Sequence, residues 1–260
     1  MVRAPRIAVT RGVSPAIVRC ELVHQARHPI DVPMARRQHE RYEAALTALG
    51  CSVQSLPADP ELPDSVFVED TAVVFDEVAV LTRPGAESRR PEVAPVAAAL
   101  AGYRTLVPIE APGTLDGGDV LVVGRTVYVG RSGRTNQAAI DQLAGHLAPR
   151  DYEVRPVAVY GCLHLKSAVT IVSEDVVLVN PRWIDPAVFT GMRPLAIDPM
   201  EPGAANALRI GDRVIYPASF PATRQRLETS GIDLVVVDVT ELQKAEGAVT
   251  CCSLVFETLA

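Results

Sequence analysis

A repeated order of short apolar segments constrains the fold of this chain more than any other feature of its sequence. These segments resemble strands and occur in close pairs. Glycine, asparagine, aspartate or a charged residue separates the two members of each pair, as a hairpin requires. The pairs are SVFVEDTAVVF with EVAVLTRP, DGGDVLVV with TVYVGRS, SAVTIVS with DVVLVN, and ALRIG with RVIYPAS.

Most of the pairs are followed by a segment of helical periodicity and then by a third apolar strand. The predicted helices of this kind cover residues 92–101, 136–147 and 221–230. The third strands are YRTLVPIE, YEVRPVAV and IDLVVVDV. The N-terminal part has the same order, with the strand RIAVTRG, a helix over residues 35–49 and the strand CSVQSLP.

Sharing one unit between the two ends of the chain completes the pattern. If TCCSLVF and RIAVTRG belong together, the chain contains five strand–strand–helix–strand units. Repeats of this period favour an α/β fold in which five blades surround a central channel, with CCSLVF as an inner strand of the closing blade. An open mixed α/β sheet remains the alternative. Because no stretch is typical of a disordered linker, we expect residues 1–260 to form a single domain.

Composition and charge exclude several classes of function. The net charge is −6, and the arginine pairs at 36–37 and 89–90 do not form a basic stripe, so we expect no nucleic-acid partner. The N-terminus lacks the apolar core of a signal peptide, and no apolar run approaches the roughly 18 residues of a membrane span. The five cysteines are scattered without a CxxC pair, which predicts neither disulfides nor a metal site. We therefore expect a cytoplasmic protein.

Two adjacent cysteines near the C-terminus, in GAVTCCSLVF, are candidates for nucleophilic chemistry. A cysteine nucleophile needs a route to the thiolate, an acid for the leaving group and a carboxylate that orients this acid. His164 lies immediately before a strand pair, where a blade begins, although a structural role is the other interpretation. The remaining histidines lie in polar or helical contexts typical of a surface: His24, His28, His39 and His146.

Carboxylate candidates come from two motifs. In GTLDGGDVLVV, the glycines between Asp116 and Asp119 let the backbone approach a neighbour closely, but a plain hairpin turn explains DGGD equally well. In LPDSVFVEDTAVVF, we expect the strand to draw Asp70 into the interior. A buried carboxylate must be paired or protonated, so Asp70 either meets an arginine of this chain or binds a cationic ligand. Arg89 and Arg134 follow strand pairs and could hold a carboxylate with two hydrogen bonds each.

Five motifs resemble those of the dimethylarginine dimethylaminohydrolases in order and spacing. They are LPDSVFVED, TRPGAESRR, GTLDGGDVL with VGRSGRTN, LHLKSAV, and EGAVTCCSL, and the similarity extends over residues 11–256. The resemblance implies the five-bladed α/β propeller of the guanidine-modifying penteins, in agreement with the repeats. It also implies hydrolysis of Nω-methylated arginines to citrulline and dimethylamine or methylamine, with no required cofactor.

The resemblance also assigns catalytic roles to individual residues. Cys251 matches the nucleophile, His164 the acid and base, and Asp116 the carboxylate that orients this histidine. Asp70 matches the carboxylate that holds the guanidinium group, with Glu69 beside it. Cys252 is interpreted as a packing residue, because adjacent strand residues point to opposite faces.

Further positions match contacts to the amino-acid part of the substrate. Arg89 and Arg134 match the clamps on the α-carboxylate. Asp64 and the backbone of Leu22 match contacts to the α-amino group, and the backbone of Ala245 matches another substrate contact. The implied partner is a small molecule, the family occurs as monomers and homodimers, and the polar loop over residues 13–33 is a plausible lid.

The implied mechanism proceeds through an S-alkylthiouronium intermediate on Cys251, with His164 protonating the amine and then activating water. Three other interpretations are open. An arginine deiminase shares the fold but carries a helical insertion for which 260 residues leave no room. A papain-like thiol hydrolase has its cysteine near the start of the chain, on a helix. A non-catalytic pentein would act as a binding module.

Overall fold

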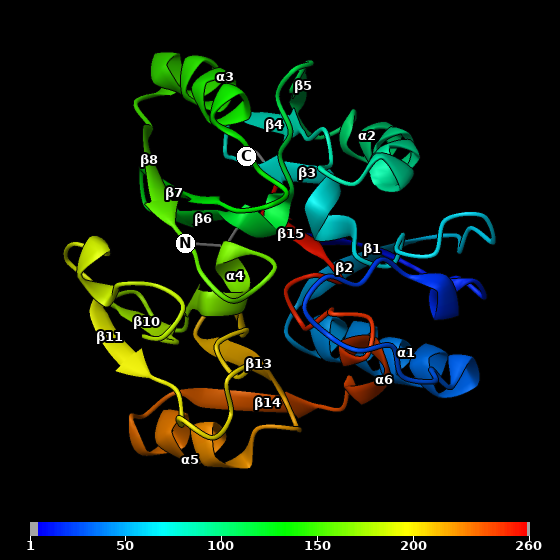
Figure 1. Ribbon diagram of the computed structural model, residues 1–260, viewed down its shortest axis with the longest axis vertical. Coiled ribbons are helices and arrows are strands. Elements are labelled where there is room, and N and C mark those ends of the chain that lie inside the picture. Colours follow the sequence, from blue (N-terminus) through cyan, green and yellow to red (C-terminus); the bar gives the residue numbers. More distant parts are fainter. Residues whose placement is uncertain (1–4, 259–260) are drawn as a thin grey trace.

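Five small sheets surround a central axis in the computed structural model, which describes residues 5–258 (Figure 1). Each sheet has three strands. The first strand pairs antiparallel with the second, and the second pairs parallel with the third. The predicted order of three strands recurs in all five sheets, and four of them include the helix, so the five-bladed propeller is confirmed and the open sheet is wrong.

In four blades the three strands are consecutive in the chain, and the closing blade joins the last strand to the first two. The closing blade contains β15 (Leu254–Glu257), β1 (Arg6–Arg11) and β2 (Cys51–Leu56), and the second blade contains β3 (Ala72–Val74), β4 (Val78–Leu81) and β5 (Thr105–Pro108). The third contains β6 (Val120–Val123), β7 (Thr126–Arg131) and β8 (Glu153–Ala158). The last two contain β9 (Val169–Ile171), β10 (Val176–Val179) and β11 (Arg193–Ala196), and β12 (Leu208–Ile210), β13 (Arg213–Pro217) and β14 (Asp233–Val237).

Helices connect the second and third strands of four blades and lie on the outside of the ring (Figure 1). They are α1 (Val32–Ala48), α2 (Val93–Leu100), α3 (Gln137–Leu147) and α5 (Pro221–Thr229). Capping side chains fix where some of them begin, because Asp31 accepts a hydrogen bond from the N–H of Met34, and Asn136 from that of Ala139. The fourth blade has only the 3₁₀ turn η6 (Pro186–Val188) at this place.

Short helical turns lie between the longer elements, several of them at the start of a blade. The α-helical turns are α4 (Leu165–Ala168) and α6 (Thr240–Gln243). The 3₁₀ turns are η1 (Ile17–Arg19), η2 (Val68–Thr71), η3 (Glu87–Glu92), η4 (Gly117–Asp119) and η5 (Ala148–Arg150). Because η2, η4 and α4 each directly precede the first strand of a blade, they lie around the same end of the central axis.

The apolar faces of the helices pack between neighbouring blades. Leu143 and Leu147 of α3 are fully buried in one cluster with Val127 and Val129 of β7 and with Val78 of β4. Burying a leucine or valine side chain contributes roughly 1.5–3 kcal/mol, so each helix stabilises its own blade and the contact with the next one.

The two ends of the chain close the ring as predicted. Strand β15 pairs antiparallel with β1, with Phe256 opposite Ile7 and Leu254 opposite Val9. Residues of the first strand of every blade line a cavity of about 670 Å³ around the axis. The C-terminal segment is therefore an inner strand, and the chain places the residues before it at the centre of the molecule.

Three details differ from the expectations. The strand predicted over CCSLVF begins only at Leu254, and the two cysteines lie in the turn before it. The fourth blade lacks the helix of the other units, and its third strand, β11, has an exposed Arg-Pro sequence that gives little apolar signal. His39 is not on the surface but buried in α1.

None of the helices between residues 5 and 258 has the length and apolar character that crossing a lipid bilayer needs.

Candidate active site

A second, much smaller cavity brings most of the predicted site residues together. It is lined by Asp64, Asp70, Arg89, Arg134, His164, Ala245 and Cys251. Its free volume is about 20 Å³, roughly the space of one water molecule, so little room is left between these side chains. The residue next to Asp70, Glu69, and the residue next to Cys251, Thr250, line the larger cavity instead. These two short segments therefore separate the cavities.

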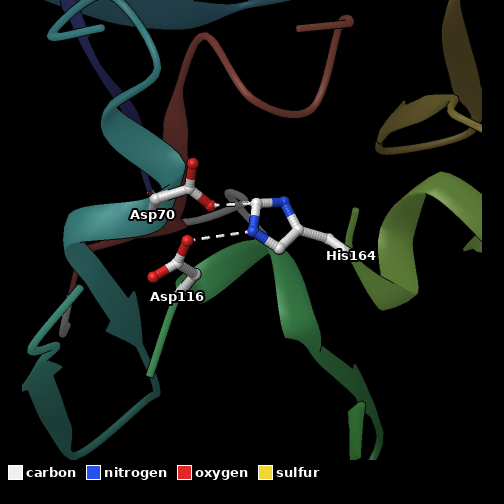
Figure 2. A group of neighbouring side chains, drawn as sticks. All are labelled: Asp70, Asp116 and His164. Carbon is white, nitrogen blue, oxygen red and sulfur yellow. Dashed lines mark hydrogen bonds and ion pairs between the residues drawn. The ribbon is translucent and has the colours of Figure 1, made fainter. Parts of the chain in front are cut away.

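His164 lies close to two carboxylates, and Figure 2 shows Asp70 and Asp116 on the same side of its ring. The Nε2 atom is 3.0 Å from Asp116 Oδ2, and the Nδ1 atom is 3.8 Å from Asp70 Oδ1. Burial alone would lower the pKa of His164, but the carboxylates of Asp70, Asp116 and Asp119 raise it to about 9. At neutral pH the ring is an imidazolium that donates to Asp116 through Nε2 and presents a second N–H, on Nδ1, to the side of Asp70.

Asp116 lies beside His164, although its side chain does not line the cavity. It is fully buried, and its Oδ1 accepts a hydrogen bond of 2.8 Å from the N–H of Gly85 while Oδ2 faces His164. A carboxylate fixed from one side by a backbone donor can hold the imidazole ring in one orientation from the other.

Close backbone packing explains the glycines of the site motifs. A Cβ atom on Gly118 would lie 2.7 Å from His164 Nδ1 and 2.9 Å from Asp70 Oδ1. The N–H of Gly118 donates to Asp70 Oδ1 at 3.0 Å. A Cβ on Gly117 would clash with the carbonyl of Glu69. The DGGD motif is thus more than a hairpin turn, because its glycines let the histidine and the aspartate approach the backbone.

Asp70 is buried and paired with an arginine of this chain, one of the two alternatives left open by the sequence. Its Oδ2 accepts a hydrogen bond of 2.6 Å from Arg89 Nη1. Burial would raise the pKa of Asp70, but the positive charges of His164 and Arg89 and the hydrogen bonds from Arg89 and Gly118 lower it to about 2. Asp70 is therefore ionised at every pH at which the protein would work.

Arg89 is held almost entirely by the protein itself. Glu92 accepts from its Nε at 3.1 Å and from its Nη2 at 2.8 Å, and the carbonyls of Asp64 and Phe67 also accept from Nη2. Glu92 is a partner that the sequence analysis missed, and its only signal is the i,i+3 spacing within η3. Of the five guanidinium donors, these contacts with described residues leave one hydrogen on Nη1 for a ligand.

Arg134 differs sharply from Arg89. It is buried, yet its Nη1 has no hydrogen-bond partner among the described residues and lies 4.0 Å from Asp116 Oδ2. Its main chain is fixed, because the N–H of Arg134 donates to Ser132 Oγ at 3.0 Å and a Cβ on Gly85 would lie 2.6 Å from the Arg134 carbonyl oxygen. A buried, unpaired guanidinium N–H on a rigid backbone is an arrangement suited to an anionic ligand.

The two cysteines lie in a turn, and both contact the apolar cluster under α1, but only Cys251 also lines the cavity. Cys251 lines the cavity, and its Sγ lies 3.9 Å from Thr250 Oγ1. Cys252 is fully buried in the apolar cluster under α1 and donates to the carbonyl of Ala248. Burial raises the pKa of the Cys251 thiol, and the charges of Glu69 and Asp70 raise it further, so the resting sulfur is protonated.

Glu69 lies next to Cys251 and does not line the small cavity. Its carboxylate accepts from Lys166 Nζ at 2.8 Å and from Thr250 Oγ1 at 2.8 Å, and its N–H donates to the Cys251 carbonyl at 3.1 Å. Asn206 completes this network through two hydrogen bonds with Thr250. The sequence analysis missed Lys166 and Asn206, whose role depends on contacts between distant blades.

Of the residues predicted to contact the α-amino group and the adjoining part of the substrate, Asp64 and Ala245 line the cavity and Leu22 does not. Asp64 lines it, and burial raises the pKa of this carboxyl while the charge of Arg89 opposes the effect. Asp64 Oδ2 accepts the N–H of Glu21 at 3.1 Å, and Ala245 is part of the wall. Leu22 follows Glu21 but does not line the cavity; its side chain packs against the apolar cluster under α1.

Other wall residues were not predicted. Apolar surface comes from Phe67 and Leu163, and negative charge comes from Glu21 and Glu246. Phe67, Leu163 and Glu246 lie within the motifs, and this position is the only signal that the sequence offered.

One cluster of described residues has the spacing of a metal site. Single ligand atoms of Asp70, Asp116 and His164 all lie within 4.8 Å of one another. The positive charge of Arg89, bonded directly to Asp70, opposes a cation at this place, and the raised pKa of His164 opposes the neutral imidazole that a metal requires. The cluster fits acid–base chemistry better.

Comparison with known proteins agrees with these observations. Residues 24–188 match the family model described as N,N dimethylarginine dimethylhydrolase, eukaryotic. The N(G),N(G)-dimethylarginine dimethylaminohydrolase of Streptomyces coelicolor is 43% identical over 249 residues, which cover 95% of each chain. The protein of the same name from Pseudomonas aeruginosa is 34% identical over 228 residues, covering 87% of this chain and 90% of the relative.

Solved structures give the same result. A cysteine-to-serine variant of the Pseudomonas aeruginosa enzyme, in complex with citrulline, matches 98% of this chain with a TM-score of 0.92 and 32% identity, and all of that chain is covered. A histidine-to-glycine variant of a dimethylarginine dimethylaminohydrolase, as an adduct with S-methyl-L-thiocitrulline, has a TM-score of 0.91 and 32% identity over 96% of this chain and 98% of the relative. With the fold, the motifs and close relatives over nearly its whole length in agreement, this chain belongs to the dimethylarginine dimethylaminohydrolase family of the pentein superfamily.

Proposed function

We propose that this protein hydrolyses Nω-methylated L-arginine, releasing L-citrulline with dimethylamine from asymmetric dimethylarginine and with methylamine from monomethylarginine. One observation carries the proposal. A single cavity combines a cysteine thiol, an imidazolium, an ionised aspartate and a buried guanidinium N–H without a partner. This set suits a substrate with a cation at one end and a carboxylate at the other. The relatives crystallised with citrulline or with a thiocitrulline adduct support it.

The amino-acid end of the substrate binds at Arg134 and Asp64. The free Nη1 of Arg134 donates to the α-carboxylate, and Arg89 adds its remaining Nη1 hydrogen and its charge. Asp64 accepts from the α-amino group, together with the backbone carbonyl of Leu22, and the backbone of Ala245 supplies a further contact. Recognition of both groups restricts the enzyme to free amino acids.

The guanidinium end binds against Asp70. Its Oδ1 accepts from Gly118 and its Oδ2 from Arg89, and a carboxylate with about four acceptor positions retains room for substrate N–H groups. Glu69 supports this site from behind, because it holds Thr250 and the Cys251 backbone in place. The central carbon of the guanidinium is then presented to the sulfur of Cys251.

The bound substrate activates the nucleophile. In the free protein, burial and two carboxylates keep the Cys251 thiol protonated. A substrate guanidinium bound at Asp70 adds a positive charge next to the sulfur. This charge offsets the two carboxylates and lowers the pKa of the thiol. The proton leaves to solvent, and the thiolate attacks the guanidinium carbon to give a neutral tetrahedral adduct.

His164 then works first as an acid and next as a base. Its imidazolium, ionised because the pKa is raised to about 9, protonates the methylated nitrogen, and the C–N bond breaks to release the neutral amine. A cationic S-alkylthiouronium remains on Cys251, beside a neutral His164. The imidazole takes a proton from water, and the hydroxide attacks the carbon to give a neutral tetrahedral adduct. The C–S bond then breaks, and the hydroxyl proton of this adduct passes to the leaving sulfur, which leaves citrulline and the Cys251 thiol. The reaction consumes only water, so no cofactor or metal enters it.

We further propose that residues 1–260 act as one catalytic domain in the cytoplasm, as a monomer or a homodimer, without a nucleic-acid or membrane partner. All five cysteines are free thiols, which fits a reducing compartment. The substrate is the only partner that the mechanism requires.

Citrulline release from purified protein tests the proposal. Asymmetric dimethylarginine and monomethylarginine should give citrulline, arginine should give far less, and Cys251→Ser should give none. Faster turnover of arginine would indicate a deiminase. Absence of citrulline from all three substrates with the wild-type protein would reject the proposal and favour a binding module.

A further inference from the structure

Glu246 connects the wall of the active-site cavity to an exposed segment of the N-terminal part. Its Oε1 accepts the backbone N–H groups of Val23 at 3.1 Å, His24 at 2.5 Å and Gln25 at 2.7 Å. Its Oε2 is also 3.1 Å from the N–H of Val23. One carboxylate thus binds three consecutive backbone donors, and each of these hydrogen bonds is strengthened by its charge.

The backbone of Glu246 has a conformation that glutamate rarely adopts. Its φ is 59°, in the left-handed region where glycine and asparagine are preferred. The next residue, Gly247, fixes this geometry, because a Cβ atom there would clash with the ring of Phe67. Strain of this kind persists only where the surroundings maintain it, and here it directs the Glu246 carboxylate at residues 23–25.

The segment that Glu246 holds directly follows Glu21, a residue of the cavity wall. The cavity, at about 20 Å³, does not admit a methylated arginine, so a wall must open for binding. Arg89, His164 and Cys251 come from buried, internally bonded parts of the fold, whereas residues 21–25 lie in an exposed connection outside the helices and strands. Besides Glu246, this segment is tied by the N–H of Glu21 to Asp64 and by the Glu21 carboxylate to Ser88.

We propose that Glu246 is a positioning residue: its carboxylate latches residues 23–25 in the closed position and thereby holds the Leu22 backbone at the α-amino group of the substrate. This inference rests on the proposed function, since Leu22 has this role only for an amino-acid substrate. The latch opens for substrate entry and product release, and its closure adds the Leu22 contact to that of Asp64.

Hydrogen exchange of the ligand-free protein tests the latch without any assay of activity. Glu246→Gly removes the carboxylate and also suits the positive φ, so the fold should persist, and unchanged thermal unfolding checks this. Loss of three charge-assisted hydrogen bonds should speed exchange at residues 23–25 by at least about tenfold. Glu246→Gln, which keeps an acceptor but no charge, should lie between this variant and the wild type.

A matched control comes from the same connection. Glu241 accepts the N–H of Asp31 at 2.8 Å, just before α1 and away from the cavity. Glu241→Gln should leave exchange at residues 23–25 and the kinetics unchanged. If Glu241→Gln and Glu246→Gly have equal effects on these amides, Glu246 is no latch.

Kinetics distinguish a positioning role from a merely structural one. In Glu246→Gly, KM for asymmetric dimethylarginine should rise about tenfold with kcat unchanged, because binding is lost equally from the ground state and the transition state. The preference for this substrate over an analogue without the α-amino group should shrink by a similar factor. A parallel loss for both compounds, or a fall in kcat alone, would overturn the inference. Wild-type protein without any citrulline release would refute the proposed function, whereas unchanged exchange in Glu246→Gly would refute the latch alone.

Discussion

Replacing Arg89 and Arg134 separately by methionine should give two different defects, although both arginines line the same cavity. Methionine preserves most of the side-chain volume and removes the charge. The buried Nη1 of Arg134 has no hydrogen-bond partner among the described residues. Replacing Arg134 therefore leaves the hydrogen bonds of Asp116 to Gly85 and His164 in place. Arg89 is bonded to the carboxylates of Asp70 and Glu92, which its loss would leave buried and uncompensated.

The magnitudes follow from these contacts. Arg134→Met removes a charge-assisted hydrogen bond to the substrate, worth roughly 1.5–3 kcal/mol, so KM should rise about tenfold to a hundredfold. Its free energy of unfolding should change by less than about 1 kcal/mol. Arg89→Met breaks a buried ion pair, which costs about 3–5 kcal/mol of unfolding free energy. At roughly 2 °C per kcal/mol for a chain of this size, Tm should fall by about 6–10 °C.

Thermal unfolding and steady-state citrulline kinetics on both variants measure the two effects. Arg89→Met should also lose activity, but its distinguishing property is the loss of stability. The reasoning is refuted if Arg134→Met lowers Tm as much as Arg89→Met does, or if Arg134→Met leaves KM unchanged.

Three further outcomes are expected. Cys251→Ser should abolish turnover while Cys252→Ser, buried outside the cavity, keeps most of it; the reverse result in a citrulline assay would move the nucleophile by one position. Asp116→Asn removes one of the carboxylates that raise the pKa of His164 to about 9, so the imidazolium should lose its proton at a lower pH. The alkaline limb of the pH profile of kcat/KM should then shift to lower pH. An unchanged alkaline limb would mean that it reports the titration of another group. Gly118→Ala places a methyl group 2.7 Å from His164 Nδ1 and should lower kcat about a hundredfold. Gly145→Ala, with open space around its Cβ, should leave kcat unchanged. Equal kcat values in the two variants would show that His164 tolerates the added methyl group.

The propeller could be predicted because its signal is local and repeated. Paired apolar strands followed by a helix recur often enough that one irregular unit does not hide the pattern. That unit, the fourth blade, is where prediction failed: β11 begins with an exposed Arg-Pro sequence, and a 3₁₀ turn replaces the helix. The start of β15 at Leu254 was also missed, because valine, threonine and cysteine before it continue the apolar pattern of a strand.

Most of the site residues proposed from the sequence line one cavity, whereas the contacts between them were harder to predict. Asp70 and Arg89 lie 19 residues apart, and the sequence left open whether they meet or each waits for a ligand. The structure shows that they meet, with Glu92 as a further partner. The buried position of His39 and the contact of Glu246 with residues 23–25 depend on how distant segments pack. No local pattern encodes such contacts, and they need the assembled ring.

Covalent capture on Cys251 is the measurement that tests the proposed chemistry most directly. His164→Gly keeps the guanidinium site at Asp70 but removes the group that activates water, so the intermediate should accumulate if solvent protonates the departing amine. The variant is mixed with asymmetric dimethylarginine, quenched with acid, and analysed by intact and peptide mass spectrometry. Asp70→Asn serves as the matched control, because it preserves the side-chain size and removes the charge that holds the substrate.

The account predicts a mass increase on the peptide containing Cys251 in His164→Gly, equal to the substrate without dimethylamine, and none in Asp70→Asn. An adduct on another residue, or equal amounts of adduct in the two variants, would contradict the division of work between Asp70, His164 and Cys251.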